Sequence, residues 1–290
     1  MAAATLTDQA ARPHAPGLDP AALLAKAGAE NFPVALRILP RAERRALRAV
    51  YGFARLVDDL GDLAAGDRSA QLDWVEADLE RAFRGCAEHP LLQALTPVAR
   101  ELRLEPEPFR RLIEANRRDQ AVSRYGTFAE LRDYCALSAN PVGELVLRVF
   151  RVLTAERLRR SDAVCTGLQI AEHLQDVGED LARGRIYLPL EDLHRFGVTE
   201  EQLRAGRRDE AFRRLLAFEV GRARGLLAEG VPLVASLRGR ARLAVAAYVG
   251  GGRAALDAVE RSGYDVLARS PRAGSRRRLA ATARVLREAA

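Results

Sequence analysis

Cysteine is scarce in this sequence, and the few cysteines are widely separated. The 290 residues contain Cys86, Cys135 and Cys165, and no two of them form a CxxC pair. An odd number of distant cysteines argues against a disulfide framework, and the missing pairs argue against a zinc site. We expect all three to be small buried side chains in a protein of a reducing compartment.

Long apolar runs are missing as well. A membrane-spanning helix needs about 18 or more consecutive apolar residues. The longest candidate here, residues 243–252, is too short and ends in three glycines. The first 20 residues lack the apolar core of a signal peptide. The sequence therefore predicts a cytoplasmic protein, in which membrane contact would be peripheral, on the inner face of the cell membrane.

Strand-like alternation of apolar and polar residues is absent, whereas helix-favouring residues are abundant. The chain is 48% hydrophobic and 29% charged, and rich in Ala, Leu, Arg and Glu. We predict an all-α fold, with a disordered leader over residues 1–18 and a single domain of about ten helices over residues 19–290. The formal net charge of +7 leaves nucleic acid, an anionic membrane surface and an anionic small substrate open as partners.

Apolar periodicity and capping signals place the individual helices. The long ones are expected over residues 41–60, 161–182, 208–229 and 237–268. The arginines of a further helix over residues 109–122 are expected to form a solvated face. A helix that begins near Thr127 must be interrupted at Asn140-Pro141, because proline lacks the amide hydrogen and clashes with the preceding turn.

Two pairs of aspartates stand four residues apart on predicted helices. Asp58 and Asp62 end one helix, and Asp176 and Asp180 lie on another. This spacing puts both carboxylates of a pair on one face, where like charges repel. Acids near a helix C-terminus also oppose the helix dipole, which makes Asp58 and Asp62 unfavourable there unless a cation binds. The two pairs are therefore predicted to face each other across the bundle.

Four facing carboxylates define an all-oxygen site, which suits Mg²⁺ and its preference for phosphate oxygens. Arg55 and Arg185 could neutralise the remaining charge of a bound diphosphate. Such a site favours loss of diphosphate and leaves a carbocation in an apolar cavity. Aromatic faces attract cations, and the candidates to line this cavity are Tyr51, Tyr134, Tyr187 and Tyr248.

Three motifs resemble those of the squalene/phytoene synthase family. They read YGFARLVDDLGD, YCALSANPVG and QIAEHLQDVGEDLARGRIYLP, and the similarity extends over about residues 25–270. The segments ENFPVALRILP and SANPVG look most like the bacterial hydroxysqualene synthase branch of hopanoid biosynthesis. The resemblance implies an isoprenoid-synthase-type bundle around a central cavity. It also implies conversion of presqualene diphosphate and water to hydroxysqualene and diphosphate, without NADPH.

The resemblance also implies roles for residues that match the family motifs. Metal ligands would be Asp58, Asp62, Asp176 and Asp180, with Mg²⁺ as the cofactor. Catalytic roles would fall to Tyr51, Arg55, Tyr134 and Tyr187. Substrate contacts would come from Asn31, Asn140, Gly143, Gln169, Glu172, Arg185 and Tyr248. The partners implied are presqualene diphosphate or farnesyl diphosphate and functional coupling to other enzymes of the pathway, but no nucleic acid.

Two positions depart from the family pattern. Glu172 stands where the family usually has Asn, so a neutral ligand oxygen becomes a charged one. His173 replaces an aromatic residue of the branch; a water-positioning base and a packed helix histidine are both open for it.

Other functions fit the sequence less well or differ only in product. Squalene, presqualene diphosphate and phytoene synthases share the motifs. A di-iron bundle needs two Glu-x-x-His motifs, and only Glu191 to His194 matches, outside the acidic helices. A non-catalytic basic helical module that binds nucleic acid or membrane would leave both aspartate pairs unexplained.

Overall fold

The fold was analysed in a computed structural model, which describes residues 18–28, 30–31, 33–36, 38–63 and 65–290. The predicted leader over residues 1–18 lies almost entirely outside this part of the chain. The described residues form α-helices and no strand; an isolated bridge joins Arg124 and Ile186. The all-α prediction is confirmed.

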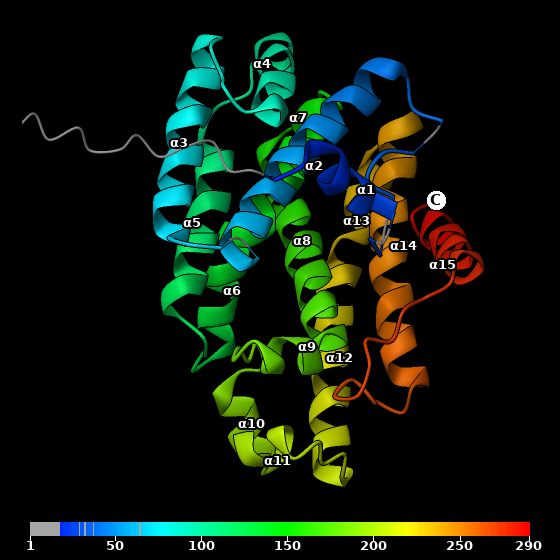
Figure 1. The fold of residues 1–290 in the computed structure, drawn as a ribbon. Helices are drawn as coiled ribbons and strands as arrows, with labels where there is room; N and C mark the ends of the chain where they lie inside the picture. Colours follow the sequence, from blue (N-terminus) through cyan, green and yellow to red (C-terminus); the bar gives the residue numbers. More distant parts are fainter. Residues whose placement is uncertain (1–17, 29, 32, 37, 64) are drawn as a thin grey trace, which may run out of the picture.

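The helices follow one another through short connections (Figure 1). The first half contains α1 Pro20–Ala25, the 3₁₀ turn η1 Lys26–Gly28, α2 Arg41–Asp62, α3 Arg68–Arg84, α4 Pro90–Leu102, α5 Glu107–Ala121, α6 Phe128–Ser138 and α7 Asn140–Val149. The second half contains α8 Ala155–Gln175, α9 Val177–Ala182, α10 Leu190–Phe196, α11 Glu200–Arg204, α12 Glu210–Glu229, α13 Val231–Ser236, α14 Gly239–Arg261 and α15 Ser275–Glu288.

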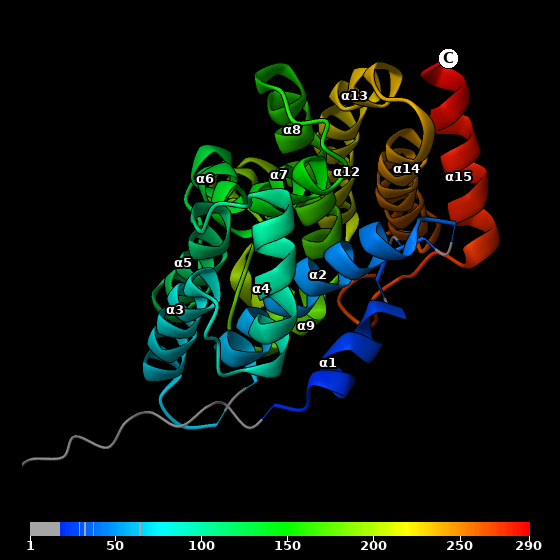
Figure 2. The same cartoon turned by 90° about the horizontal axis from the view of Figure 1, so that it is seen from above.

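Two hydrophobic cores flank the middle of the molecule. The first is built mainly by α2 to α5, around Phe53 and Phe109. The second is built mainly by α8, α12 and α14, around Phe212. Helix α7 contributes to both cores, because Leu145 belongs to the first and Leu147 to the second. Seen from above, α3 and α15 lie at opposite sides of the bundle (Figure 2).

Several predicted helices are found close to their expected bounds. The helix expected over residues 41–60 is α2, and its apolar residues Leu47, Val50 and Val57 are buried. The expected interruption at Asn140 separates α6 from α7. The helix expected over residues 208–229 corresponds to α12.

Other bounds were wrong, and the expected number of helices was too small. The helix expected over residues 161–182 begins earlier, at Ala155, and is broken at Asp176. The break occurs where the distant residue Val266 accepts a hydrogen bond from the Gly178 amide, 3.1 Å away. The helix expected over residues 237–268 ends at Arg261, and α13 and α15 were not predicted as helices.

Candidate active site

A polar cavity and an apolar cavity adjoin each other between the two cores. The polar cavity has a volume of about 370 Å³, and the apolar one about 210 Å³. Residues shared by both linings are Glu30, Arg55, Asp58, Leu112, Ser138, Gln169 and Glu172. The arrangement therefore offers one site with a charged end and an apolar end.

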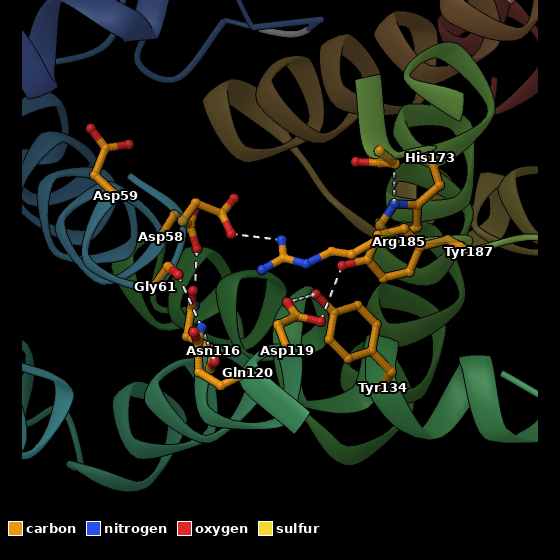
Figure 3. A network of polar contacts seen from close by, with 12 residues as sticks. Asp58, Asp59, Gly61, Asn116, Asp119, Gln120, Tyr134, His173, Arg185 and Tyr187 are labelled. Carbon is orange, nitrogen blue, oxygen red and sulfur yellow. Dashed lines mark hydrogen bonds and ion pairs between the residues drawn. The ribbon is translucent and has the colours of Figure 1, made fainter. Parts of the chain in front are cut away.

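The last turns of α2 form one wall of the polar cavity. Asp58 Oδ1 accepts a hydrogen bond from Asn116 Nδ2 at 3.2 Å. The Asp58 side chain is accessible from the cavity but enclosed by protein, and this desolvation raises its pKa to about 6. Asp62 Oδ1 lies 2.6 Å from Arg185 Nη1, which reaches across from the opposite wall (Figure 3).

Asp59, the middle aspartate of the motif, has a different environment. Its side chain is buried, and it pairs with Lys26 at 2.5 Å and with Arg55 at 2.7 Å. Arg55 and Lys26 also line the polar cavity. Asp59 therefore holds two cations at the edge of the site without being part of its lining.

The break between α8 and α9 forms the opposite wall. Asp176 lies at this break and pairs with Arg272 Nη2 at 3.3 Å. Asp180 lies on α9, with its Oδ2 3.7 Å from His173 Nδ1. Together with Asp58 and Asp62, both line the polar cavity, so the structure brings together the two aspartate pairs singled out in the sequence.

The four aspartates do not form a compact ligand shell. Among the residues that the structure describes, no three His, Cys, Asp or Glu side chains are grouped closely enough to hold a metal ion by themselves. Their oxygen donors nevertheless fit Mg²⁺, which keeps several waters and takes its other oxygens from one or two carboxylates and from substrate phosphates. The donor set therefore suits an ion that binds together with a diphosphate.

Asp119 links the two tyrosines expected to be catalytic (Figure 3). It accepts a hydrogen bond from the Tyr134 hydroxyl at 2.6 Å and another from the Tyr187 hydroxyl at 3.0 Å. Burial raises the pKa of both phenols well above the ordinary value, with nearby negative charge adding to the effect. Both side chains are therefore neutral at physiological pH and present their rings to the polar cavity.

His173 packs against this aromatic wall. Its ring stacks on that of Tyr187, with a centroid distance of 3.8 Å and an interplanar angle of 13°. Its Nε2 lies 3.2 Å from Gln169 Nε2. The ring is thus a packed helix histidine that also lines the polar cavity, and a role as a water-positioning base stays a prediction.

Glu172 lies where the polar and apolar cavities meet. Burial, together with the neighbouring carboxylates Glu30, Asp176 and Asp58, raises the pKa of Glu172 to about 8. A group at this position is therefore protonated over much of the neutral range in the free protein. Glu172 stands where the family usually has Asn, and because its carboxyl is largely neutral, this replacement adds less negative charge to the site than an ionised glutamate would.

Three predicted site residues line the apolar cavity and not the polar one. Tyr51 and Tyr248 line it, and the Tyr51 hydroxyl donates to Glu30 at 2.9 Å. Gly143 lies where a Cβ atom would be only 2.4 Å from Ser161 Oγ and 2.5 Å from Cys165 Sγ. A side chain at that position would therefore displace the packing of α7 on α8.

Asn31 and Asn140 are placed differently from the expectation, because neither lines the two cavities as the described residues define them. Asn31 Nδ2 donates to Gln175 Oε1 at 2.6 Å, and Asn140 Oδ1 accepts from Thr166 Oγ1 at 3.1 Å. Both side chains therefore support the walls from behind in this structure and do not contact the open space.

Sequence reasoning missed several residues of the lining. They include Lys26, Glu30, Asn116, Asp119, Ser138 and Arg272. Asn116 and Asp119 stand three residues apart on α5, a spacing that could have indicated a polar face. The arginines around them hid this signal, and the expected solvated face was wrong: Arg117, for example, pairs with Asp73 and Glu76, both at 2.6 Å.

The fold and the site together define an all-α protein of the isoprenoid synthase type. A family model, Squalene/phytoene synthase, matches residues 25–282. The chain therefore belongs to the squalene/phytoene synthase family, a family of head-to-head prenyltransferases.

Relatives and solved structures agree with this assignment. The phytoene synthase of Thermus thermophilus is 36% identical over 248 residues, 84% of this chain and 83% of that protein. The 15-cis-phytoene synthase of a Synechocystis strain is 35% identical, over 83% of this chain and 76% of that protein. A crystal structure of the squalene synthase HpnC of Alicyclobacillus acidocaldarius has a TM-score of 0.77 and 46% identity, and it covers 87% of this chain and 99% of its own. The crystal structure of a dehydrosqualene synthase in complex with a ligand has a TM-score of 0.82 and 25% identity. The match covers 93% of this chain and 95% of the dehydrosqualene synthase.

Proposed function

We propose that this protein is a Mg²⁺-dependent hydroxysqualene synthase of hopanoid biosynthesis. It would convert presqualene diphosphate and water to hydroxysqualene and diphosphate, without a nicotinamide reductant. The observation that carries the proposal is the pairing of the charged cavity with the apolar cavity, because an isoprenoid diphosphate needs both environments at once. The 46% identity with a squalene synthase HpnC supports this branch of the family.

The charged cavity would bind the diphosphate. Asp58, Asp62, Asp176 and Asp180 would hold Mg²⁺, which when bound neutralises the diphosphate oxygens and stabilises the leaving group. Arg185 now pairs with Asp62 at 2.6 Å and would turn its guanidinium to the diphosphate. Arg55 is held by Asp59 at the edge of the same cavity and would add a second positive charge.

The aromatic wall would serve the carbocation that remains. When the carbon–oxygen bond breaks, its electron pair leaves with the diphosphate and positive charge stays on the hydrocarbon. The faces of Tyr134 and Tyr187 attract that charge, and Asp119 fixes both rings through their hydroxyls. Water then adds to the cation, and His173 would accept the proton that this water releases.

A phytoene or presqualene diphosphate synthase is the second candidate, favoured by the 34–36% identity with phytoene synthases. Product analysis separates the candidates. The protein is incubated with Mg²⁺ and presqualene, farnesyl or geranylgeranyl diphosphate in ¹⁸O-labelled water, and the lipids are identified by mass spectrometry. We expect ¹⁸O-labelled hydroxysqualene from presqualene diphosphate without NADPH. Squalene formed only with NADPH, or phytoene from geranylgeranyl diphosphate, would overturn the assignment.

Asp176→Asn tests the proposed diphosphate site. It should reduce diphosphate release at saturating Mg²⁺ by roughly 100-fold or more, because it removes a carboxylate from one wall of the site. Far-ultraviolet circular dichroism should remain that of the parent protein. Retained turnover in this variant would count against the proposed role of the aspartate pairs.

A further inference from the structure

Each acidic wall of the polar cavity has an arginine paired with one of its aspartates. On the α2 wall, Asp62 pairs with Arg185 at 2.6 Å. On the α8–α9 wall, Arg272 Nη2 lies 3.3 Å from one carboxylate oxygen of Asp176 and 3.4 Å from the other. Arg272 lines the same cavity as Arg185. One aspartate of each pair is therefore neutralised by a cation from another part of the chain.

Arg272 belongs to the α14–α15 connection, residues 262–274. This connection runs beside α9 before it reaches α15 (Figure 1). The fully buried side chain of Gln175 donates through Nε2 to the backbone oxygen of Pro271. Because Gln175 precedes Asp176 and Pro271 precedes Arg272, this bond fixes the main chain on both sides of the ion pair.

Further contacts hold the same connection against α9. Ser270 Oγ donates to Glu179 Oε1 at 2.6 Å. A Cβ atom at Gly178 would lie only 2.4 Å from the backbone oxygen of Leu267, so the two segments touch through their main chains. The backbone of Arg272 is therefore held at the rim of the polar cavity.

The side chain of Arg272, by contrast, is held loosely. It is 45% exposed, whereas that of Asp176 is 17% exposed. Its two contacts with the carboxylate are longer than the about 2.7–2.9 Å of a good charge-assisted hydrogen bond. Partly exposed ion pairs of this kind add little to stability. The guanidinium can thus leave Asp176 at small cost while its backbone stays in place.

We propose that Arg272 neutralises Asp176 in the free protein and moves to the diphosphate when Mg²⁺ and diphosphate bind together. A cation on Asp176 would repel the guanidinium, and diphosphate oxygens would offer it a bidentate partner instead. Arg272 then adds to Arg55 and Arg185 from a third part of the chain. The inference rests on the proposed function, because it takes the polar cavity as the diphosphate site.

Two binding measurements on Arg272→Gln test this exchange without any turnover. Calorimetry measures the binding of Mg²⁺ alone, and of inorganic diphosphate at saturating Mg²⁺. The variant should bind Mg²⁺ alone about 2- to 5-fold more tightly than the parent protein, because no guanidinium competes for Asp176. It should bind diphosphate about 10-fold or more weakly, because a charge-assisted contact is lost.

Two further variants make the test specific. Arg272→Lys keeps the charge without the planar fork, so it should bind Mg²⁺ alone like the parent protein and lose only part of the diphosphate affinity. Arg276→Gln removes an exposed arginine near the start of α15 that lines neither cavity. This control should keep both parental affinities.

The opposite signs of the two effects separate an exchange from a structural role. Diphosphate affinity equal to that of the parent protein in Arg272→Gln would overturn the proposal. Mg²⁺ binding that is unchanged or weaker in this variant would overturn it too, as would an equal loss of diphosphate affinity in Arg276→Gln. A parent protein that binds no diphosphate with Mg²⁺ would contradict the proposed function itself, whereas the other failures concern Arg272 alone.

Discussion

Asp119 shows how one unpredicted residue can organise a site. Its two oxygens accept from the Tyr134 and Tyr187 hydroxyls, and the rings of these tyrosines lie 5.5 Å apart. A buried carboxylate that accepts two phenolic hydrogens fixes both rings more firmly than packing alone. The aromatic wall is therefore oriented by a side chain of α5 that itself lines the polar cavity.

Asp119→Asn should lower kcat for diphosphate release by about 100-fold, with a smaller change in KM. The amide can accept from one hydroxyl only, so one tyrosine loses its orientation toward the cation. Steady-state kinetics on the proposed substrate measure the effect. Asp133→Asn, at an exposed position of α6, is the control and should keep parental rates. Equal kcat in the Asp119 variant and the parent protein would refute an orienting role for this carboxylate.

At the scale of elements, the tight packing of α14 on α15 depends on a glycine. A Cβ atom at Gly250 would lie 2.6 Å from the backbone nitrogen of Thr282. Gly225, inside α12, has no atom within 4 Å of the corresponding position. The two glycines stand in similar helical surroundings but differ in the space beside them.

This difference predicts that replacing glycine by alanine has opposite effects on stability at the two positions. Gly250→Ala should lower the free energy of unfolding by about 1–3 kcal/mol, because α15 must move away from α14. Gly225→Ala should raise it by about 1 kcal/mol, because alanine favours the helix and nothing obstructs its methyl group. Urea denaturation followed by circular dichroism measures both values. A stabilised Gly250→Ala variant would show that α15 does not pack on α14 as described.

The elements also show which features a sequence can predict. Helix α2 was found near its expected bounds because its own apolar spacing and the preceding proline determine it. The break at Asp176 could not be predicted, because its cause is the hydrogen bond from Gly178 to the distant Val266. The aspartate pairs were predicted because the two carboxylates of each pair repel each other on the helix that the sequence predicts. Asn116 and Asp119 cause no such local conflict, so only the folded chain shows their place in the lining.

At the scale of the whole molecule, a buried charge cluster links stability to pH. Glu219 is 1% exposed and pairs with Arg222 at 2.9 Å, while Arg222 also pairs with Asp192 at 2.7 Å. Burial raises the pKa of Glu219, and the nearby Asp192 raises it further. A raised pKa means that the folded state binds a proton more tightly than the unfolded state. The contribution of Glu219 to the free energy of unfolding is therefore greatest at low pH. It is lost as pH rises from about 4.3, the pKa of a glutamate in the unfolded chain, through the pKa of Glu219 in the folded state.

Glu219→Gln should flatten this pH dependence. Between pH 5 and 8 the free energy of unfolding of the parent protein should fall by about 2 kcal/mol more than that of the variant. Urea titrations across this range measure the difference. Glu229→Gln, at an exposed position near the end of α12, is the control and should follow the parent curve. Parallel curves for Glu219→Gln and the parent protein would mean that this carboxyl does not titrate differently on folding.

The position of the polar cavity between the two cores makes ligand binding a property of the whole molecule. Asp58 belongs to the α2 wall and Asp176 to the α8–α9 wall, so an ion-bridged diphosphate would join both halves of the bundle.

Mg²⁺ and inorganic diphosphate together should raise Tm by about 5 °C at ligand concentrations near 100 times Kd. Either component alone should give a smaller shift. Asp58→Asn and Asp176→Asn should each remove most of the joint shift, whereas Asp133→Asn should retain it. Calorimetry at fixed protein concentration compares them, and a full shift in the Asp176 variant would show that the diphosphate binds without the second wall.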